Sequence, residues 1–205
     1  MTRLPFPSAP EFSRRSFLAA ASASVLATLP GTALAITAGQ ASALVERALT
    51  DINSVLSSGK SGEALYREFE NIFIRYADVP VIASSVLGPD WRTATDAQRR
   101  AFTAAFQGYL ARKYGKEFRD MGGADLRIER SVPVNRYIEV RTRESSGSSG
   151  SEVTFLVADR SGQARFFDLL IDGVSIRLRE RGEIGALLDA RRGNIDRLIA
   201  DLGTL

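Results

Sequence analysis

The residues that could do chemistry in this sequence are carboxylates, lysines, arginines and tyrosines, because the chain contains neither His nor Cys. Their absence excludes an imidazole base, a thiol nucleophile, a disulfide framework and a Cys/His zinc site. A general base would have to be a carboxylate, a lysine or a tyrosine. Asp168 and Asp172 lie within an apolar strand pattern, and Asp168 is the better candidate for a perturbed carboxyl group. Because a strand-borne Asp near a turn usually accepts hydrogen bonds from the backbone or from Arg, a structural role is the stronger interpretation.

The sequence also lacks the loops that bind common cofactors. The segment Asp172-Gly173-Val174-Ser175 has neither the glycine pattern of a dinucleotide site, nor the lysine of a P-loop, nor the second glycine of a nucleophile elbow. No close set of carboxylates reaches the density of a calcium loop. We therefore expect no cofactor, no metal and no enzymatic activity.

Residues 1–35 have the pattern of an export signal. The adjacent arginines Arg14 and Arg15 precede an uncharged, mostly apolar run from Phe17 to Leu29. That run is shorter than the roughly 20 residues of a membrane-spanning helix and fits the ~7 to 15 of a signal-peptide core. The paired arginines are typical of twin-arginine translocation, with a general secretory signal or an uncleaved amphipathic anchor as alternatives. The small-x-small pattern at 33–35 predicts cleavage after Ala35, which leaves residues 36–205 as a single exported domain.

Much of the basic character of the chain belongs to this leader. Removal of Arg3, Arg14, Arg15 and Glu11 lowers the formal net charge from +3 to +1. Proteins that bind nucleic acid normally carry a basic stripe or patch. Nucleic acid is therefore not an expected partner.

Helices come first in the mature part. Apolar residues at helical spacing predict helices over 38–56, from about Gly62 to Tyr76, and over 79–87. Thr95 and Gln98 have the spacing of a capping box, which predicts the start of a long helix with a one-sided aromatic stripe. Gly122-Gly123 is expected to close that helix.

After Gly123 the apolar period changes from helical to alternating, which indicates strands. Strands are expected around Leu126 to Val140, over 153–158 and over 164–171, with the Ser/Gly segment 145–151 as a long hairpin loop. The last strand is apolar on both faces and should be covered on both sides. Two short helices, 176–190 and 194–202, finish the chain. The fold class is therefore α+β, with a helical layer on a curved antiparallel sheet of about four strands.

Two segments have residue patterns typical of one protein family. The first is Leu87-Gly88-x-x-Trp91-Arg92-x-Ala94-Thr95-x-x-Gln98-Arg99-x-x-Phe102, followed by Phe106, Leu110 and Tyr114. The second is Phe167-Asp168-Leu169-Leu170-Ile171-Asp172-Gly173-Val174-Ser175-Ile176, with Arg181 and the closing Gly193-x-x-x-Arg197-Leu198-Ile199-x-x-Leu202. These segments resemble the MlaC, or toluene-tolerance, family of periplasmic phospholipid-binding proteins, and the resemblance covers nearly all of residues 40–202. Glu180 departs from it, since an aromatic or other neutral residue is expected there.

The resemblance implies a roll related to nuclear transport factor 2, with acyl chains held in an apolar pocket between sheet and helices. It implies a soluble substrate-binding component that shuttles phospholipid between an outer-membrane lipoprotein complex and an inner-membrane ABC transporter, in a system that maintains outer-membrane lipid asymmetry. A related branch works beside hopanoid synthesis genes, so a hopanoid-associated carrier is a second hypothesis. A third is an enzyme on the same roll that uses Asp168, and a fourth is an adaptor that binds only proteins.

Pocket walls are expected from bulky residues on the helices and the sheet, although each of them can equally be ordinary core. The helical candidates are Phe73, Val81, Ile82, Val86, Phe102, Phe106 and Tyr109, and those of the sheet are Ile138, Val140, Phe155, Val157, Leu169 and Ile171. Arg92, Arg99 and Arg143 are the candidates for binding a phosphate head group, because a guanidinium can donate two parallel hydrogen bonds to phosphate oxygens.

Overall fold

The computed structural model describes residues 36–120, 126–144 and 152–205, which belong to one compact unit. The predicted signal peptide, the Gly122-Gly123 helix stop and the Ser/Gly loop lie outside the described residues. The elements in chain order are α1 Ala38–Ser57, α2 Gly62–Tyr76, α3 Val79–Leu87, α4 Asp90–Thr93, α5 Asp96–Asp120, β1 Leu126–Val134, β2 Tyr137–Glu144, β3 Glu152–Asp159, β4 Ala164–Ile171, β5 Val174–Ser175, α6 Ile176–Ala190 and α7 Ile195–Leu202.

The five strands form one antiparallel sheet in the order β1-β2-β3-β4-β5, which confirms the predicted α+β class. The pairing registers shift between Ile128 and Arg130 and between Leu156 and Val157. Such bulges bend the strand that carries them and increase its twist. The expected four strands are joined by a fifth, β5, which pairs with β4 over two residues.

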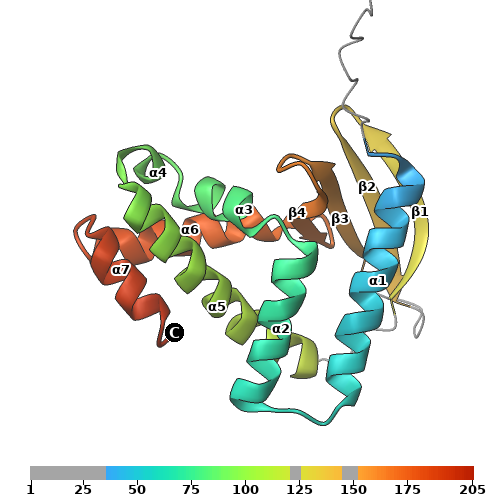
Figure 1. Ribbon diagram of the computed structural model, residues 1–205, viewed down its shortest axis with the longest axis horizontal. Helices are drawn as coiled ribbons and strands as arrows, with labels where there is room; N and C mark the ends of the chain where they lie inside the picture. The colour runs from blue at the N-terminus through green and yellow to red at the C-terminus, as the bar shows by residue number, and fades with distance from the viewer. Residues whose placement is uncertain (1–35, 121–125, 145–151) are drawn as a thin grey trace, which may run out of the picture. The chain divides into compact units, whose positions relative to one another are not determined.

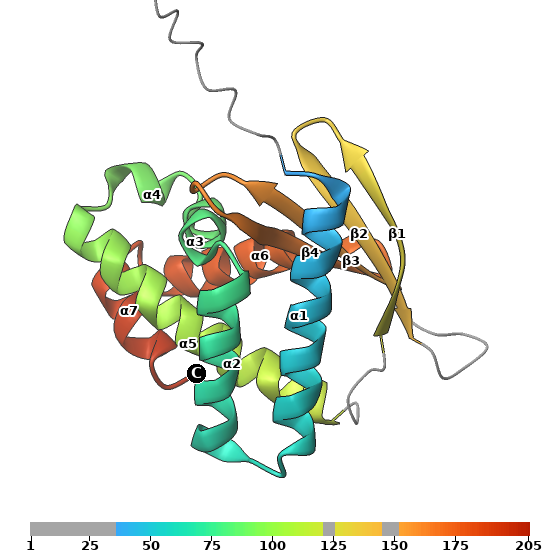
Figure 2. The same ribbon diagram turned by 45° about the vertical axis from the view of Figure 1, so that its right-hand side comes forward.

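Helix α1 lies along one face of the sheet, next to β1 and β2 (Figures 1 and 2). Its buried stripe includes Ala41, Val45 and Ala48, whose small side chains allow close contact with the strands. The inward side chains of the sheet, such as Val140 and Val157, are fully buried. This part of the core is filled by apolar side chains.

Helices α2, α3, α6 and α7 pack around α5, or around one another, away from β1. The capping box at the start of α5 is confirmed: the Gln98 amide donates to Thr95 Oγ1 at 3.2 Å, and the Thr95 amide donates to Gln98 Oε1 at 3.0 Å. Where α5 crosses α2, a Cβ at Gly115 would come within 3.1 Å of the Phe69 ring. This glycine therefore allows the two helices to approach closely.

Strand β4 connects the sheet to the helical cluster. Phe166, Phe167 and Asp168 are consecutive and all buried, which confirms that both faces are covered at this point. The short α4, which the sequence did not predict, is a single turn before the start of α5. Among the described residues, no helix combines the length and apolar character needed to cross a membrane.

Candidate functional site

Two small apolar cavities lie between the sheet and the helices. The larger has a volume of about 50 Å³ and lies among β4, α3, α5 and α6, and the smaller, of about 30 Å³, lies among α1, α2 and the sheet. Five residues line both cavities and so separate them: Phe73, Phe118, Phe166, Leu169 and Ile171. Motion of these shared side chains would join the two spaces into one.

The structure brings five of the predicted wall residues to these cavities, namely Phe73, Ile82, Phe155, Leu169 and Ile171. Tyr109 instead lines an open groove at α5 and α6. The remaining seven line none of these spaces and lie in or beside the packed core: Val81, Val86, Phe102, Phe106, Ile138, Val140 and Val157. Phe102 and Phe106 stack on each other with ring centroids 5.6 Å apart, so the aromatic stripe of α5 mainly fills the core.

The lining of the cavity of about 50 Å³ is mostly apolar, and its charged members are Asp168, Arg177 and Glu180. Glu180 has only 1% of its surface exposed. Its Oε1 accepts hydrogen bonds from Lys113 Nζ at 2.8 Å and from the Tyr114 hydroxyl. Among the residues that the structure describes, no donor reaches its Oε2. One sign of this site is visible in the sequence, namely an acidic residue at a position where a neutral one is expected.

The groups around Glu180 form a connected polar cluster. Lys113 also pairs with Glu183, and the Tyr109 hydroxyl donates to Glu183 Oε2 at 2.9 Å. Burial raises the pKa of Tyr109 to about 12, with Lys113 acting in the opposite direction. Burial alone would lower the pKa of Lys113, but hydrogen bonds to Glu180, Glu183 and Tyr109 outweigh it and raise that pKa. The tyrosine and the lysine of the cluster therefore hold their protons more tightly than they do in the unfolded chain.

A second buried carboxylate, Asp168, stands where β4 turns toward α6. Its Oδ1 accepts from the Leu169 amide at 2.8 Å and from the Arg177 amide at 3.0 Å, and its Oδ2 accepts from the Ser175 hydroxyl at 2.6 Å. Arg177 Nε lies 3.4 Å from the same Oδ2. Because donors already satisfy both oxygens, Asp168 fixes the turn and the first residues of α6.

An open groove of about 680 Å³ lies beside the polar cluster. Its walls come from α2, α5, α6 and the C-terminus and carry more basic than acidic groups: Tyr66, Tyr109, Arg112, Lys113, Lys116, Glu183, Ala186, Leu187 and Leu205. Lys113 lines the groove, while its partner Glu180 lines the apolar cavity. This basic surface was not predicted from the sequence. Its signal there is weak: Arg112 and Lys113 are adjacent on α5, and Lys116 follows three residues later.

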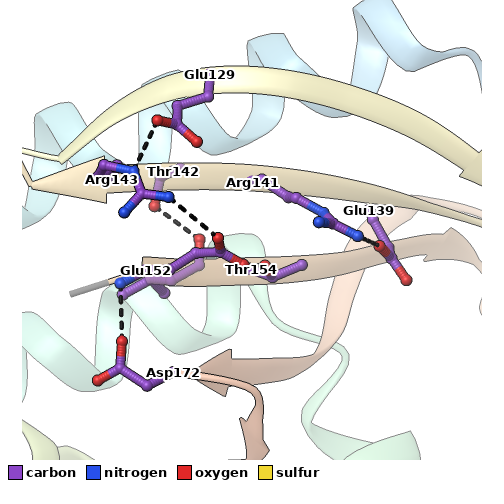
Figure 3. A network of polar contacts seen from close by, with 9 residues as sticks. Glu129, Glu139, Arg141, Thr142, Arg143, Glu152, Thr154 and Asp172 are labelled. Carbon is purple, nitrogen blue, oxygen red and sulfur yellow. Dashed lines mark hydrogen bonds and ion pairs between the residues drawn. The ribbon is translucent and has the colours of Figure 1, made fainter.

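The three arginines proposed for head-group binding line neither the groove nor the cavities. Arg99 donates from Nε to the Trp91 carbonyl at 2.8 Å and pairs with Asp96, so it braces α4 against α5. Arg143 pairs with Glu129 and Glu152 across the sheet, as Figure 3 shows. Arg92 is exposed.

Apart from Thr142, which is buried on the other face, the network of Figure 3 lies on the face of the sheet that points away from α1. Besides the Arg143 pairs, it includes an ion pair of 2.9 Å between Arg141 and Glu139, and the Glu152 amide donates to Asp172 Oδ1 at 2.9 Å. Arg141 and Glu139 both lie on β2, whereas the Arg143 pairs join adjacent strands and stabilise their register modestly. This face is thus polar and internally paired, in contrast to the apolar face that contacts the helices.

Comparison with known proteins adds two findings. Residues 43–204 match the family described as the MlaC protein. The fold is also similar to that of a phospholipid-binding protein from Ralstonia solanacearum, whose structure was determined in complex with a phospholipid. That match has a TM-score of 0.62 at 17% sequence identity and covers 79% of this chain and 94% of the other chain.

Proposed function

Since this chain belongs to the MlaC family of phospholipid-binding proteins, we propose that it is a periplasmic carrier that holds lipid acyl chains between its sheet and its helices. The observation that carries the proposal is the pair of neighbouring apolar cavities at this interface. The family consists of lipid-binding carriers and not of enzymes. Asp168 was considered as a catalytic base. Its oxygens instead accept hydrogen bonds from residues of the turn before α6 and of the start of that helix.

The energetics of transfer suit a carrier without catalytic groups. One buried CH₂ is worth roughly 0.8 kcal/mol relative to water. A lipid in a bilayer, however, already has its chains in an apolar medium. The carrier therefore needs only to match the membrane, and a docking partner can shift the balance in either direction.

Binding must enlarge the space that the structure contains. A site for a small ligand usually encloses ~300 Å³ or more, whereas the cavities measure about 50 and 30 Å³. We propose that an entering chain displaces Phe73 and Phe118, which stand between the two cavities. Both side chains are only partly buried, and Phe118 lies near the end of α5, so each has fewer neighbours to hold it than a residue of the packed core.

The lipid head group would bind in the basic groove. Lys113 and Lys116 line it and can attract a phosphate, with the apolar cavity directly behind Lys113. Arg92, exposed on α4, remains the alternative among the arginines predicted from the sequence. The lipid would be a phospholipid, or a hopanoid-like lipid if the chain serves that branch of the family.

The proposed route runs between an outer-membrane lipoprotein complex and an inner-membrane ABC transporter, after export with a signal peptide cleaved near Ala35. A reconstitution test would mix the purified protein with lipid-loaded vesicles carrying one complex and acceptor vesicles carrying the other. Lipid transfer that depends on the protein and on both complexes is expected. Transfer at the rate of protein-free vesicles would contradict the shuttle role.

Lipid binding itself is tested by mass spectrometry of organic extracts from the purified protein, where a co-purifying acyl lipid is expected. Leu169→Trp should reduce that lipid several-fold, because Leu169 lines both cavities. Leu170→Trp is the matched control, since Leu170 is the next residue on β4 and lines neither cavity. Equal lipid in both variants, at equal stability, would contradict the proposed pocket.

The small cavities also favour a second function, that of an adaptor that binds only proteins. The same extracts separate the two functions. An adaptor would yield no acyl lipid from the wild type, and Leu169→Trp would then change only stability.

A further inference from the structure

The two carboxylate oxygens of Glu180 differ in their hydrogen bonds. Oε1 accepts from Lys113 and Tyr114, whereas Oε2 has no partner although only 1% of the residue is exposed. A buried acceptor without a donor costs free energy, and the cost is larger for a charged group. Native structures rarely keep such a group without a reason. Glu180 lines the apolar cavity, so a donor placed in that cavity would satisfy it.

Neighbouring basic side chains donate to other acceptors. Arg177 donates to Asp168 and Ser85, and Arg179 donates to the Tyr114 hydroxyl at 3.0 Å. Lys113 is shared among Glu180, Glu183 and Tyr109. Within the described part of the chain, the missing donor is therefore most simply supplied by the ligand.

We propose that Glu180 selects lipids that carry a free hydroxyl group where the apolar chain joins the polar part. Glu180 stands at the right place for this group, because Lys113 connects it to the groove while its own side chain lines the cavity. A hydroxyl donates one hydrogen bond and adds no charge. A phosphate oxygen at Oε2 would be repelled by the carboxylate.

This inference rests on the proposed lipid-carrier function, and its test separates the two. The probes are an octadecyl lysophosphocholine with a free glycerol hydroxyl and the same lipid with that hydroxyl methylated, both used below their micelle concentrations. Methylation removes the donor and keeps the chain and head group. Octadecanol and its methyl ether form a second pair, which separates the glycerol hydroxyl of a phospholipid from the hydroxyl of a neutral lipid.

Displacement of a fluorescent fatty acid from the full mature protein would measure affinity. The wild type should bind the hydroxyl lipid of at least one pair about 10-fold more tightly than its methyl ether, because a hydrogen bond to a charged group is lost in the ether. The preference should disappear in Lys113→Met/Glu180→Met. That double variant removes both charges together and so leaves neither ion unpaired.

Glu183→Gln is the matched control. It also removes one carboxylate partner of Lys113, but its side chain is 45% exposed and does not line the cavity. Because Glu183 lines the groove proposed for the head group, the affinities for both lipids of a pair can change together. Their ratio, which is the hydroxyl preference, should be kept. Equal binding within both pairs by the wild type, or a preference that survives in the folded double variant, would overturn the role of Glu180. Failure of every probe and of ordinary phospholipid to bind would overturn the carrier function as well.

Discussion

Asp168 and Glu180, two of the three buried carboxylates among the described residues, differ in how their oxygens are satisfied. At the turn between β4 and α6, donors satisfy both oxygens of Asp168. At the contact between α5 and α6, Glu180 has one oxygen satisfied by Lys113 and Tyr114 and the other without a partner. Both residues line the cavity of about 50 Å³, so they differ in their donors and not in their access to the cavity. The comparison indicates that the oxygens of Asp168 are committed to the turn, whereas Oε2 of Glu180 is left for a ligand.

The largest effect is expected from Asp168→Ala. Removal of this carboxylate leaves Arg177 and two backbone amides without their acceptor, which should lower the free energy of unfolding by about 4 kcal/mol. Urea denaturation would measure the change, with Asp189→Ala, at an exposed position on α6, as control. A loss below about 1 kcal/mol would mean that the Asp168 region is not architectural in this sense.

The Glu180 region should respond differently to single and double changes. Lys113→Met leaves a buried carboxylate without its cation and should cost about 3 kcal/mol of stability. Lys113→Met/Glu180→Met should lie within about 1 kcal/mol of the wild type, since an apolar pair replaces an ion pair whose desolvation is costly. A double-mutant cycle by urea denaturation tests this. Additive losses would show that the two side chains act independently.

Alkaline pH should weaken the Glu180 region selectively. Tyr109 has its pKa raised from 10.0 to about 12 on folding, and the pKa values of Tyr114 and Lys113 are also raised. A group with a raised pKa in the folded state stabilises fully below its unfolded pKa and loses that contribution as pH rises through the folded one. Stability should therefore fall between about pH 10 and pH 12. The urea midpoint of the wild type should fall as the pH rises through this range. In Tyr109→Phe the midpoint should depend less on pH, and in Asp168→Asn it should fall as steeply as in the wild type.

The smallest effect is expected at low pH. Burial would raise the pKa of Glu183, but hydrogen bonds from Lys113 and Tyr109 outweigh it and lower that pKa. The stabilisation is therefore present above the pKa of an unfolded Glu and is lost as pH falls through the lower folded value. Below about pH 4.5 the urea midpoint of Glu183→Gln should therefore fall slightly less steeply with decreasing pH than that of the wild type. An acid limb steeper than that of the wild type would contradict this sign.

The sequence predicted the elements well wherever one signal dominated. The bounds of α3, β4 and α6 agree with the predicted 79–87, 164–171 and 176–190 because turn residues flank a clear apolar pattern. The structural interpretation of Asp168 is supported for a similar reason, since its donors come from residues within nine positions of it in the chain. Local signals were enough for these features.

The binding site was predicted less completely. An apolar stripe shows that Phe102 and Phe106 face inward, but not whether they fill the core or border a cavity, and in the structure they stack on each other. Phe118 lines both cavities and was not predicted. The basic groove combines residues of α2, α5, α6 and the C-terminus, which no spacing along the chain brings together.

By itself, the sequence determined the absence of thiol and imidazole chemistry, the order of helices and strands, and the resemblance to a lipid-binding family. It also marked Glu180 as unusual. Only the tertiary structure decided that this carboxylate is buried against Lys113 with one oxygen directed to no protein donor. The physical reason is that composition and period depend on neighbours in the chain, whereas hydrogen-bond satisfaction depends on side chains 66 and 67 positions away in sequence.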